Sequence, residues 1–224
     1  MHKKRITREK IINAFLFCAF DKSAGATSLQ DIAQGLEIKK ASLYNHFEGR
    51  EEMYLATLEY CRKYLASVKF VPDNLFEEAN LGNTEVYKLF ERFIKSYIQV
   101  YESEPVLQIY TFVHTEQYFN PIAAKTVDAE LLRTEYDVSR LILSSCKVLK
   151  TSLSPIDVDF ISKWYAKFLL GQIDLYIMHK KEILRQNPEC GVGSLFALPT
   201  DEGALEEIYA QSKMFFNRLN ILFP

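Results

Sequence analysis

Apolar residues recur at spacings of three and four along most of this 224-residue chain, and no long segment alternates with a period of two. Spacings of three and four place side chains on one face of an α-helix, whereas a period of two is typical of a half-buried strand. The clearest case is segment 86–101, in which eight apolar or aromatic residues follow the helical spacing. The sequence therefore predicts an all-α fold.

Capping and turn residues divide the chain into separate helices. Ser28 can cap a helix, with Asp31 three residues later to complete a capping box. Asn120 can cap another, before a first-turn proline at Pro121. The segment "VPDNLFEEANLGNT" is rich in turn residues and is expected to separate a head, residues 1–70, from a larger body, residues 71–224. The helices are expected at about 7–20, 28–36, 39–47, 51–69, 83–101, 105–118, 122–150, 156–186 and 204–222.

Charge is distributed unevenly between these two parts. The formal net charge of the chain is only -2, but residues 1–50 carry nine Lys and Arg against five Asp and Glu. The remaining residues carry 18 against 24. A basic head on an acidic body predicts that any nucleic acid is bound by the head.

The sequence offers no sign of an enzyme, a metal site, a cofactor or a membrane span. The four cysteines are far apart, and the four histidines lack partners at metal-ligand spacing. Apolar runs are shorter than the roughly 20 residues of a membrane helix, and no signal-peptide cleavage site follows the first apolar segment. These features predict a protein of the reducing cytoplasm.

Segments 28–36 and 39–47 have the length and spacing of a helix-turn-helix, whose second helix enters the major groove of double-stranded DNA. Leu43 and Phe47 are expected to anchor the second helix to the core. The alternative is an ordinary solvated helix, but the ordered set of polar residues favours DNA. Its lysines suit phosphates or base acceptors, and its hydroxyl, amide and imidazole groups suit bases and phosphates. The set is Lys39, Lys40, Ser42, Tyr44, Asn45 and His46.

The motifs "TSLQDIA" and "KKASLYNHFEGREEM" resemble those of the tetracycline-repressor (TetR) family of bacterial transcription regulators, over about residues 8–53. The resemblance implies that Thr27 and Ser28 lie near a phosphate and that residues 39–45 approach the bases. It also implies that Tyr44, His46 and Arg50 hold the DNA backbone. For the body, it implies a small effector site and a homodimer formed by the last two helices.

Three positions differ from the usual pattern of that family. Glu37 replaces a turn glycine, so a residue with a side chain is expected to adopt a left-handed conformation at a cost of about 1 kcal/mol. Arg50 replaces a lysine, and its guanidinium group could donate two hydrogen bonds to one phosphate. Ser23 stands where a glycine is more usual, and the glycine lies at Gly25 instead.

Two features leave alternatives open. The basic N-terminal segment "MHKKRITREK" has two possible roles. It either keeps the terminus soluble, or it contacts DNA along the backbone or in the minor groove. The 13 Tyr, 16 Phe and one Trp include many aromatic residues of the body, which either fill a core or line a small-molecule cavity. The expected ligand-binding residues are Tyr97, Tyr101, Tyr110, His114, Trp164, Phe168, Gln172 and Tyr176.

The sequence therefore predicts a homodimeric DNA-binding transcriptional regulator. The favoured form is a repressor that leaves a palindromic operator when a small hydrophobic effector binds. The alternative is a dimeric DNA-binding protein without a small effector, whose body is a protein-interaction module.

Overall fold

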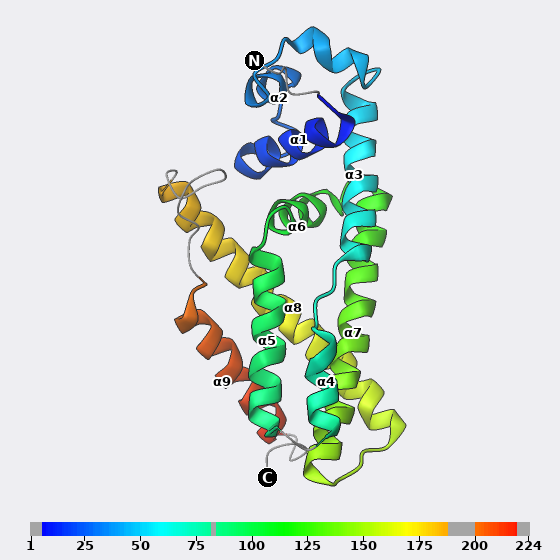
Figure 1. Ribbon diagram of the computed structural model, residues 1–224, viewed down its shortest axis with the longest axis vertical. Helices are drawn as coiled ribbons and strands as arrows, with labels where there is room; N and C mark the ends of the chain where they lie inside the picture. Colours follow the sequence, from blue (N-terminus) through cyan, green and yellow to red (C-terminus); the bar gives the residue numbers. More distant parts are fainter. Residues whose placement is uncertain (1–5, 82–83, 188–199, 219–224) are drawn as a thin grey trace. The chain divides into compact units, whose positions relative to one another are not determined.

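The computed structural model describes residues 6–81, 84–187 and 200–218 (Figure 1). Within these ranges the chain forms helices joined by turns and contains no strand, which confirms the all-α prediction. The elements are α1 (Arg8–Lys22), α2 (Leu29–Gly35), the 3-10 helix η1 (Lys40–Asn45), α3 (Arg50–Ser67), α4 (Asp73–Asn80), α5 (Val86–Glu102), α6 (Val106–Glu116), α7 (Pro121–Leu149), α8 (Pro155–Gln186) and α9 (Glu202–Arg218).

The chain divides into two compact units. The head unit comprises residues up to 68 together with residues 103–129, and the body unit comprises residues 69–102 together with residues from 130 onward. The head unit therefore includes α6 and the first turns of α7 besides the helix-turn-helix. The functional division into residues 1–70 and 71–224 stays a prediction. It assigns residues 103–129 to the body, whereas these residues belong to the compact head unit.

Aromatic side chains of α1, α3 and α6 form the core of the head unit. The rings of Phe15 and Phe112 meet edge to face with centroids 5.6 Å apart, and Phe15 is fully buried. The hydroxyl of Tyr54 donates to Oε2 of Glu116 at 2.7 Å. These contacts hold α6 against the helices that carry the helix-turn-helix.

The core of the body unit is an aromatic cluster shared by α5, α8 and α9, whose ribbons lie near one another in Figure 1. The ring centroid of Phe216 lies 4.8 Å from those of both Phe90 and Tyr165, and all three side chains are fully buried. The Tyr165 hydroxyl donates to Oγ of Ser212 at 2.8 Å, so its polar end is satisfied inside the core. This cluster fixes α9 on α5 and α8.

The predicted caps are confirmed. Ser28 and Asp31 form a complete capping box at the start of α2. Oδ1 of Asn120 accepts the N–H of Ile122 at 2.9 Å at the start of α7.

Two local predictions need correction. The segment expected to be only a turn contains α4, because Leu75, Phe76 and Ala79 are buried and share one helical face. The short helix expected at 39–47 is a 3-10 helix over Lys40–Asn45. The final helix begins at Glu202, and the expected residues 219–222 lie outside the described residues.

Within the described ranges, none of the helices combines the length and apolar character that crossing a membrane would require.

Candidate nucleic-acid interface

The 3-10 helix η1 presents one polar face and one apolar face. Leu43 and the following Phe47 are 1% and 2% exposed, which confirms that they anchor this segment in the head core. Tyr44 is 51% exposed. The side chains of Lys39, Lys40 and Asn45 are exposed as well, whereas those of Ser42 and His46 are half-buried. The exposed face of η1 therefore carries cationic, amide and phenol groups, which are the groups that bind phosphates and base edges.

The turn that connects α2 to η1 is closed by backbone hydrogen bonds. The N–H of Ile38 donates to the carbonyl of Ala33 at 2.9 Å, and the N–H of Glu37 donates to that of Gln34 at 3.0 Å. This pair of bonds defines a Schellman motif, whose central position requires a left-handed backbone. Glu37 occupies that position with φ of 55°, so the expected left-handed conformation is confirmed.

The loop before α2 contains a second strained residue. Ser23 has φ of 78° and ψ of 158°, a region that is almost restricted to glycine. Its carbonyl accepts the hydroxyl of Thr27 at 2.7 Å, and Thr27 is 1% exposed. The hydroxyl of Ser28 is likewise engaged within the head, with Asp31. Proximity of Thr27 and Ser28 to a phosphate stays a prediction.

Arg50 joins this loop to the start of α3. Its Nη2 donates to the carbonyl of Ala24 at 2.5 Å and to that of Gly25 at 3.3 Å, and its Nε donates to that of Thr27 at 3.3 Å. The guanidinium group expected to bind a phosphate thus donates to three backbone carbonyls within residues 24–27. Contact between Arg50 and DNA stays a prediction, and the geometry gives the side chain a positioning role in the loop before α2.

Arg8 makes a comparable connection that the sequence did not reveal. Its guanidinium donates to the carbonyl of His46 at 2.5 Å and to Oε1 of Glu52 at 2.7 Å, and lies 4.1 Å from the centroid of the Phe47 ring. The Arg8 hydrogen bond, followed by the N–H of Glu48, holds the pKa of Glu52 below its usual value. Lys3, Lys4 and Arg5 of the N-terminal segment lie outside the described residues.

Known proteins place this head in a family. The sequence model of bacterial regulatory proteins of the tetR family matches residues 11–57, which include α2, η1 and the residues of the polar face. The head of this chain matches the tetR family. Proteins of this family regulate transcription through DNA, so this chain is a DNA-binding transcriptional regulator and not an enzyme.

Relatives and solved structures extend the similarity beyond the head. The chain is 28% identical over 131 residues to IcaR of Staphylococcus epidermidis, the negative transcriptional regulator of the biofilm operon icaADBC, covering 51% of this chain and 70% of IcaR. It is 26% identical over 178 residues to IcaR of Staphylococcus aureus strain Newman, covering 74% and 86%. The crystal structure of AibR in complex with isovaleryl coenzyme A and operator DNA has the same fold, with a TM-score of 0.54, 14% identity and coverage of 91% and 96%.

The residues expected to bind a ligand are dispersed over both units of this chain. Tyr110 and His114 belong to the head unit, where their rings stack with centroids 3.9 Å apart. Trp164 is 59% exposed, so it does not lie in an enclosed cavity of the single chain. Phe168 stacks on Phe215 at 5.9 Å, and Gln172 is half-buried.

Tyr97 and Tyr101 of α5 are fully buried, and each hydroxyl has an acidic partner on α7. Tyr97 donates to Oδ2 of Asp137 at 2.8 Å, and Tyr101 donates to Oε1 of Glu130. Nη2 of Arg133 donates to the Tyr101 hydroxyl at 3.3 Å, and its guanidinium lies 3.6 Å from the centroid of the Phe70 ring. Burial, followed by the nearby carboxylate, raises the pKa of each tyrosine. Both phenols therefore remain neutral donors within a packed network.

Tyr176, the eighth expected residue, lines a cavity of the body unit. In the described parts of the chain, no group of three or more His, Cys, Asp or Glu side chains has an arrangement that could hold a metal ion.

Proposed function

We propose that this protein is a homodimeric repressor that binds a palindromic operator and leaves it when a small, largely apolar effector binds. The observation that carries the proposal is the face of η1 on which Lys39, Lys40, Tyr44 and Asn45 are exposed while Leu43 is buried. Repression is supported by the similarity to IcaR, which is described as a negative regulator. Binding of a small molecule is supported by AibR, a protein of the same fold that was solved in complex with isovaleryl coenzyme A and operator DNA.

A dimer would place two copies of η1 on successive major grooves of one face of DNA, about 34 Å apart. The proposed dimer surface is a stripe on α8 in which Ile156, Phe160 and Trp164 are 80%, 57% and 59% exposed. These residues lie four apart and so share one face of α8. A second copy of the chain would remove this apolar stripe from water. Since operator DNA lies in the cytoplasm of a bacterium, we propose that compartment as the place of action.

The test is selection of binding sites from random DNA duplexes, followed by titration with salt. We expect enrichment of a palindrome, and an affinity that falls as salt rises because lysine contacts with phosphates release counterions. Replacing Lys40 or Asn45 by alanine should weaken binding and relax base preference, whereas Tyr44→Phe should weaken binding to all sequences alike. Absence of any enriched site, or affinity that does not change with salt, would contradict the proposal.

A second candidate is a dimeric DNA-binding regulator without a small effector. The full burial of Tyr97 and Tyr101, with both hydroxyls bonded to carboxylates, favours it, because this part of the body is packed. A screen of small molecules for release of the protein from its selected operator separates the two candidates. A coupling free energy of about 1–3 kcal/mol, typical of allosteric regulators, would weaken operator binding about 5- to 150-fold.

A further inference from the structure

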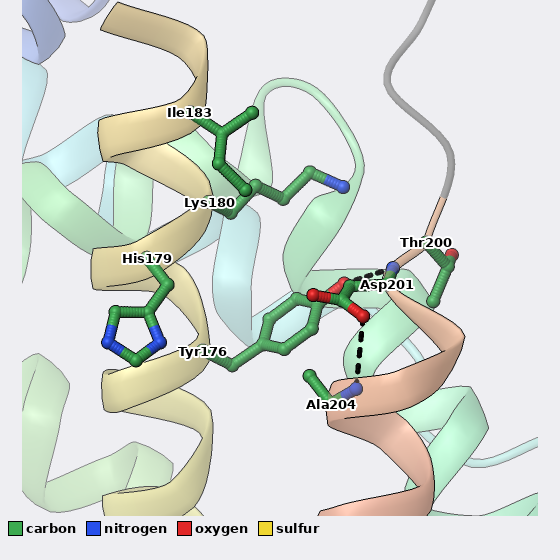
Figure 2. A pocket seen from close by; sticks show the side chains of 7 residues that line it. All are labelled: Tyr176, His179, Lys180, Ile183, Thr200, Asp201 and Ala204. Carbon is green, nitrogen blue, oxygen red and sulfur yellow. Dashed lines mark hydrogen bonds between the residues drawn. The ribbon is translucent and has the colours of Figure 1, made fainter. Parts of the chain in front are cut away.

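A cavity of about 250 Å³ lies in the body unit between the C-terminal half of α8 and the start of α9 (Figure 2). Its walls are formed by Tyr176, His179, Lys180 and Ile183 of α8 and by residues of the segment 200–204. A cavity of about 150 Å³ can hold benzene. This cavity therefore has room for a single ring with a short substituent.

One wall of the cavity is held in place by hydrogen bonds to Glu102, the last residue of α5. Its carboxylate accepts from the hydroxyl of Tyr176, from Nζ of Lys180, and from Oγ1 of Thr200 at 2.6 Å. The side chains of Lys180 and Glu102 are only 11% and 10% exposed. Because a buried ion pair is stable only when its hydrogen bonds are satisfied, Lys180 is committed to Glu102 and is not offered to a ligand.

The side of the cavity formed by residues 200–204 carries the carboxylate of Asp201, and its backbone bonds to the ring hydroxyl of Tyr176. The Asp201 N–H donates to the Tyr176 hydroxyl at 3.1 Å, and Oδ1 of Asp201 accepts the N–H of Ala204 at 3.0 Å. These bonds fix the ring of Tyr176 between α8 and the Asp201 side chain (Figure 2). Burial, followed by the bond to Glu102, raises the pKa of Tyr176, so its hydroxyl stays a donor.

The charges around the cavity favour a cation over an anion. Among the described residues at the cavity, Lys180 and Glu102 neutralise each other as an ion pair, and the carboxylate of Asp201 remains, with the His179 imidazole on the exposed side of α8. An anionic ligand would be repelled by the carboxylate of Asp201. An ammonium group would be attracted to Asp201 and to the face of an aromatic ring such as that of Tyr176.

We propose that this cavity binds a small organic ammonium ion of about the size of benzylamine. Asp201 accepts hydrogen bonds from the ammonium group, and Tyr176 and Ile183 contact the apolar part. That this ligand acts as the effector rests on the proposed function. The site shares only Tyr176 with the set expected from the sequence.

Glu102 lies where the chain passes from the body unit into the head unit, so its hydrogen bonds link the cavity to that point of the chain. Glu102 ends α5, and the following residue, Ser103, belongs to the head unit. A ligand that shifts Tyr176 or Thr200 therefore alters the bonds of the residue at which the chain leaves the body unit. The hydrogen bonds of the cavity wall therefore reach Glu102, and the backbone continues from Glu102 into the unit that carries η1.

Calorimetric titration of the full-length protein at pH 7 with benzylamine, benzyl alcohol and benzoate tests the site, because these probes differ mainly in charge. Benzylamine should bind about 5-fold or more tightly than benzyl alcohol, the effect of an ion pair open to solvent, and benzoate should bind most weakly. Asp201→Asn should remove the preference for the amine while keeping the helix cap, since asparagine caps as well as aspartate. The matched control is Asp159→Asn, which removes an exposed carboxylate of α8 that bonds to Lys163.

Two variants test the location. Ile183→Trp should abolish binding of both benzylamine and benzyl alcohol by filling the cavity, and the 40% exposure of Ile183 leaves room for the larger side chain without repacking of the core. Ala204→Phe fills the cavity from α9, and circular dichroism establishes that each variant is folded. Equal binding of the three probes, a preference that survives Asp201→Asn, or unchanged binding to both folded filling variants would overturn the proposed site.

Operator affinity measured on the same samples distinguishes failure of the proposed ligand site from failure of the proposed function. Benzylamine that binds as expected but leaves operator affinity unchanged supports the site and contradicts its role as the effector site. Failure of the untreated protein to select an operator contradicts the proposed function, whatever the calorimetric result.

Discussion

Replacing Glu37 by glycine should stabilise the protein. Glu37 is exposed, and it holds the left-handed position of the Schellman motif with φ of 55°. A residue with a Cβ loses about 1–2 kcal/mol in this conformation, and glycine avoids that loss. Glycine in turn loses about 0.5–1 kcal/mol more backbone entropy on folding. The difference predicts that Glu37→Gly raises the free energy of unfolding by about 0.5–1 kcal/mol.

Urea unfolding followed by circular dichroism measures this change as a shift of the midpoint at unchanged slope. Glu37→Ala is the matched control, because alanine removes the charge and the long side chain but keeps the Cβ. We expect no stabilisation from alanine. An equal gain from alanine and glycine would refute the argument from backbone conformation, since the gain would then come from loss of the glutamate side chain and not from loss of the Cβ.

Three other results are expected. The Lys22 ammonium, followed by the N–H of a capping serine, lowers the pKa of Asp31 from 3.8 to about 2, so its contribution to stability is present above pH 3.8 and is lost as the pH falls toward 2. The difference in urea midpoint between wild type and Asp31→Asn should therefore be constant at neutral pH and shrink over that acidic range. Tyr165→Phe should lower the free energy of unfolding by about 1 kcal/mol, because the bond to Ser212 is lost while that serine still donates to a backbone carbonyl. Phe160→Glu should convert a dimer into a monomer in sedimentation at micromolar concentration, and a wild type that sediments as a monomer would contradict the proposed dimer surface.

Local sequence signals predicted the parts of the fold that depend on local bonds. The capping box of Ser28, the cap at Asn120 and the left-handed Glu37 each involve residues within a few positions of one another. The polar and apolar faces of η1 also followed from spacing alone. The sequence missed α4 because the proline, glycine and asparagine residues of this segment suggested a loop, although Pro72 only precedes the first turn of that helix.

Long-range partners were beyond what spacing could predict. Arg8 bonds to Glu52, 44 residues away, and Tyr101 bonds to Glu130, 29 residues away. The ligand site expected at Tyr101 stays a prediction, and the partner of its buried hydroxyl, Glu130, lies on another helix. The cavity beside Tyr176 depends on the approach of α9 to α8, which no local pattern encodes.

The bonds of Arg50 have a consequence for the construction of chimeric regulators. Its three carbonyl acceptors lie at residues 24–27, before α2, and Arg50 itself lies after η1. An exchange of residues 28–47 would replace the whole segment predicted to contact bases and leave both ends of this connection in the host protein. An exchange that begins inside residues 24–27 would pair Arg50 with a foreign loop, and one that extends past residue 50 would replace Arg50 itself while keeping the host loop. Boundaries just inside this connection should therefore give chimeras that recognise a new operator and fold as the host does.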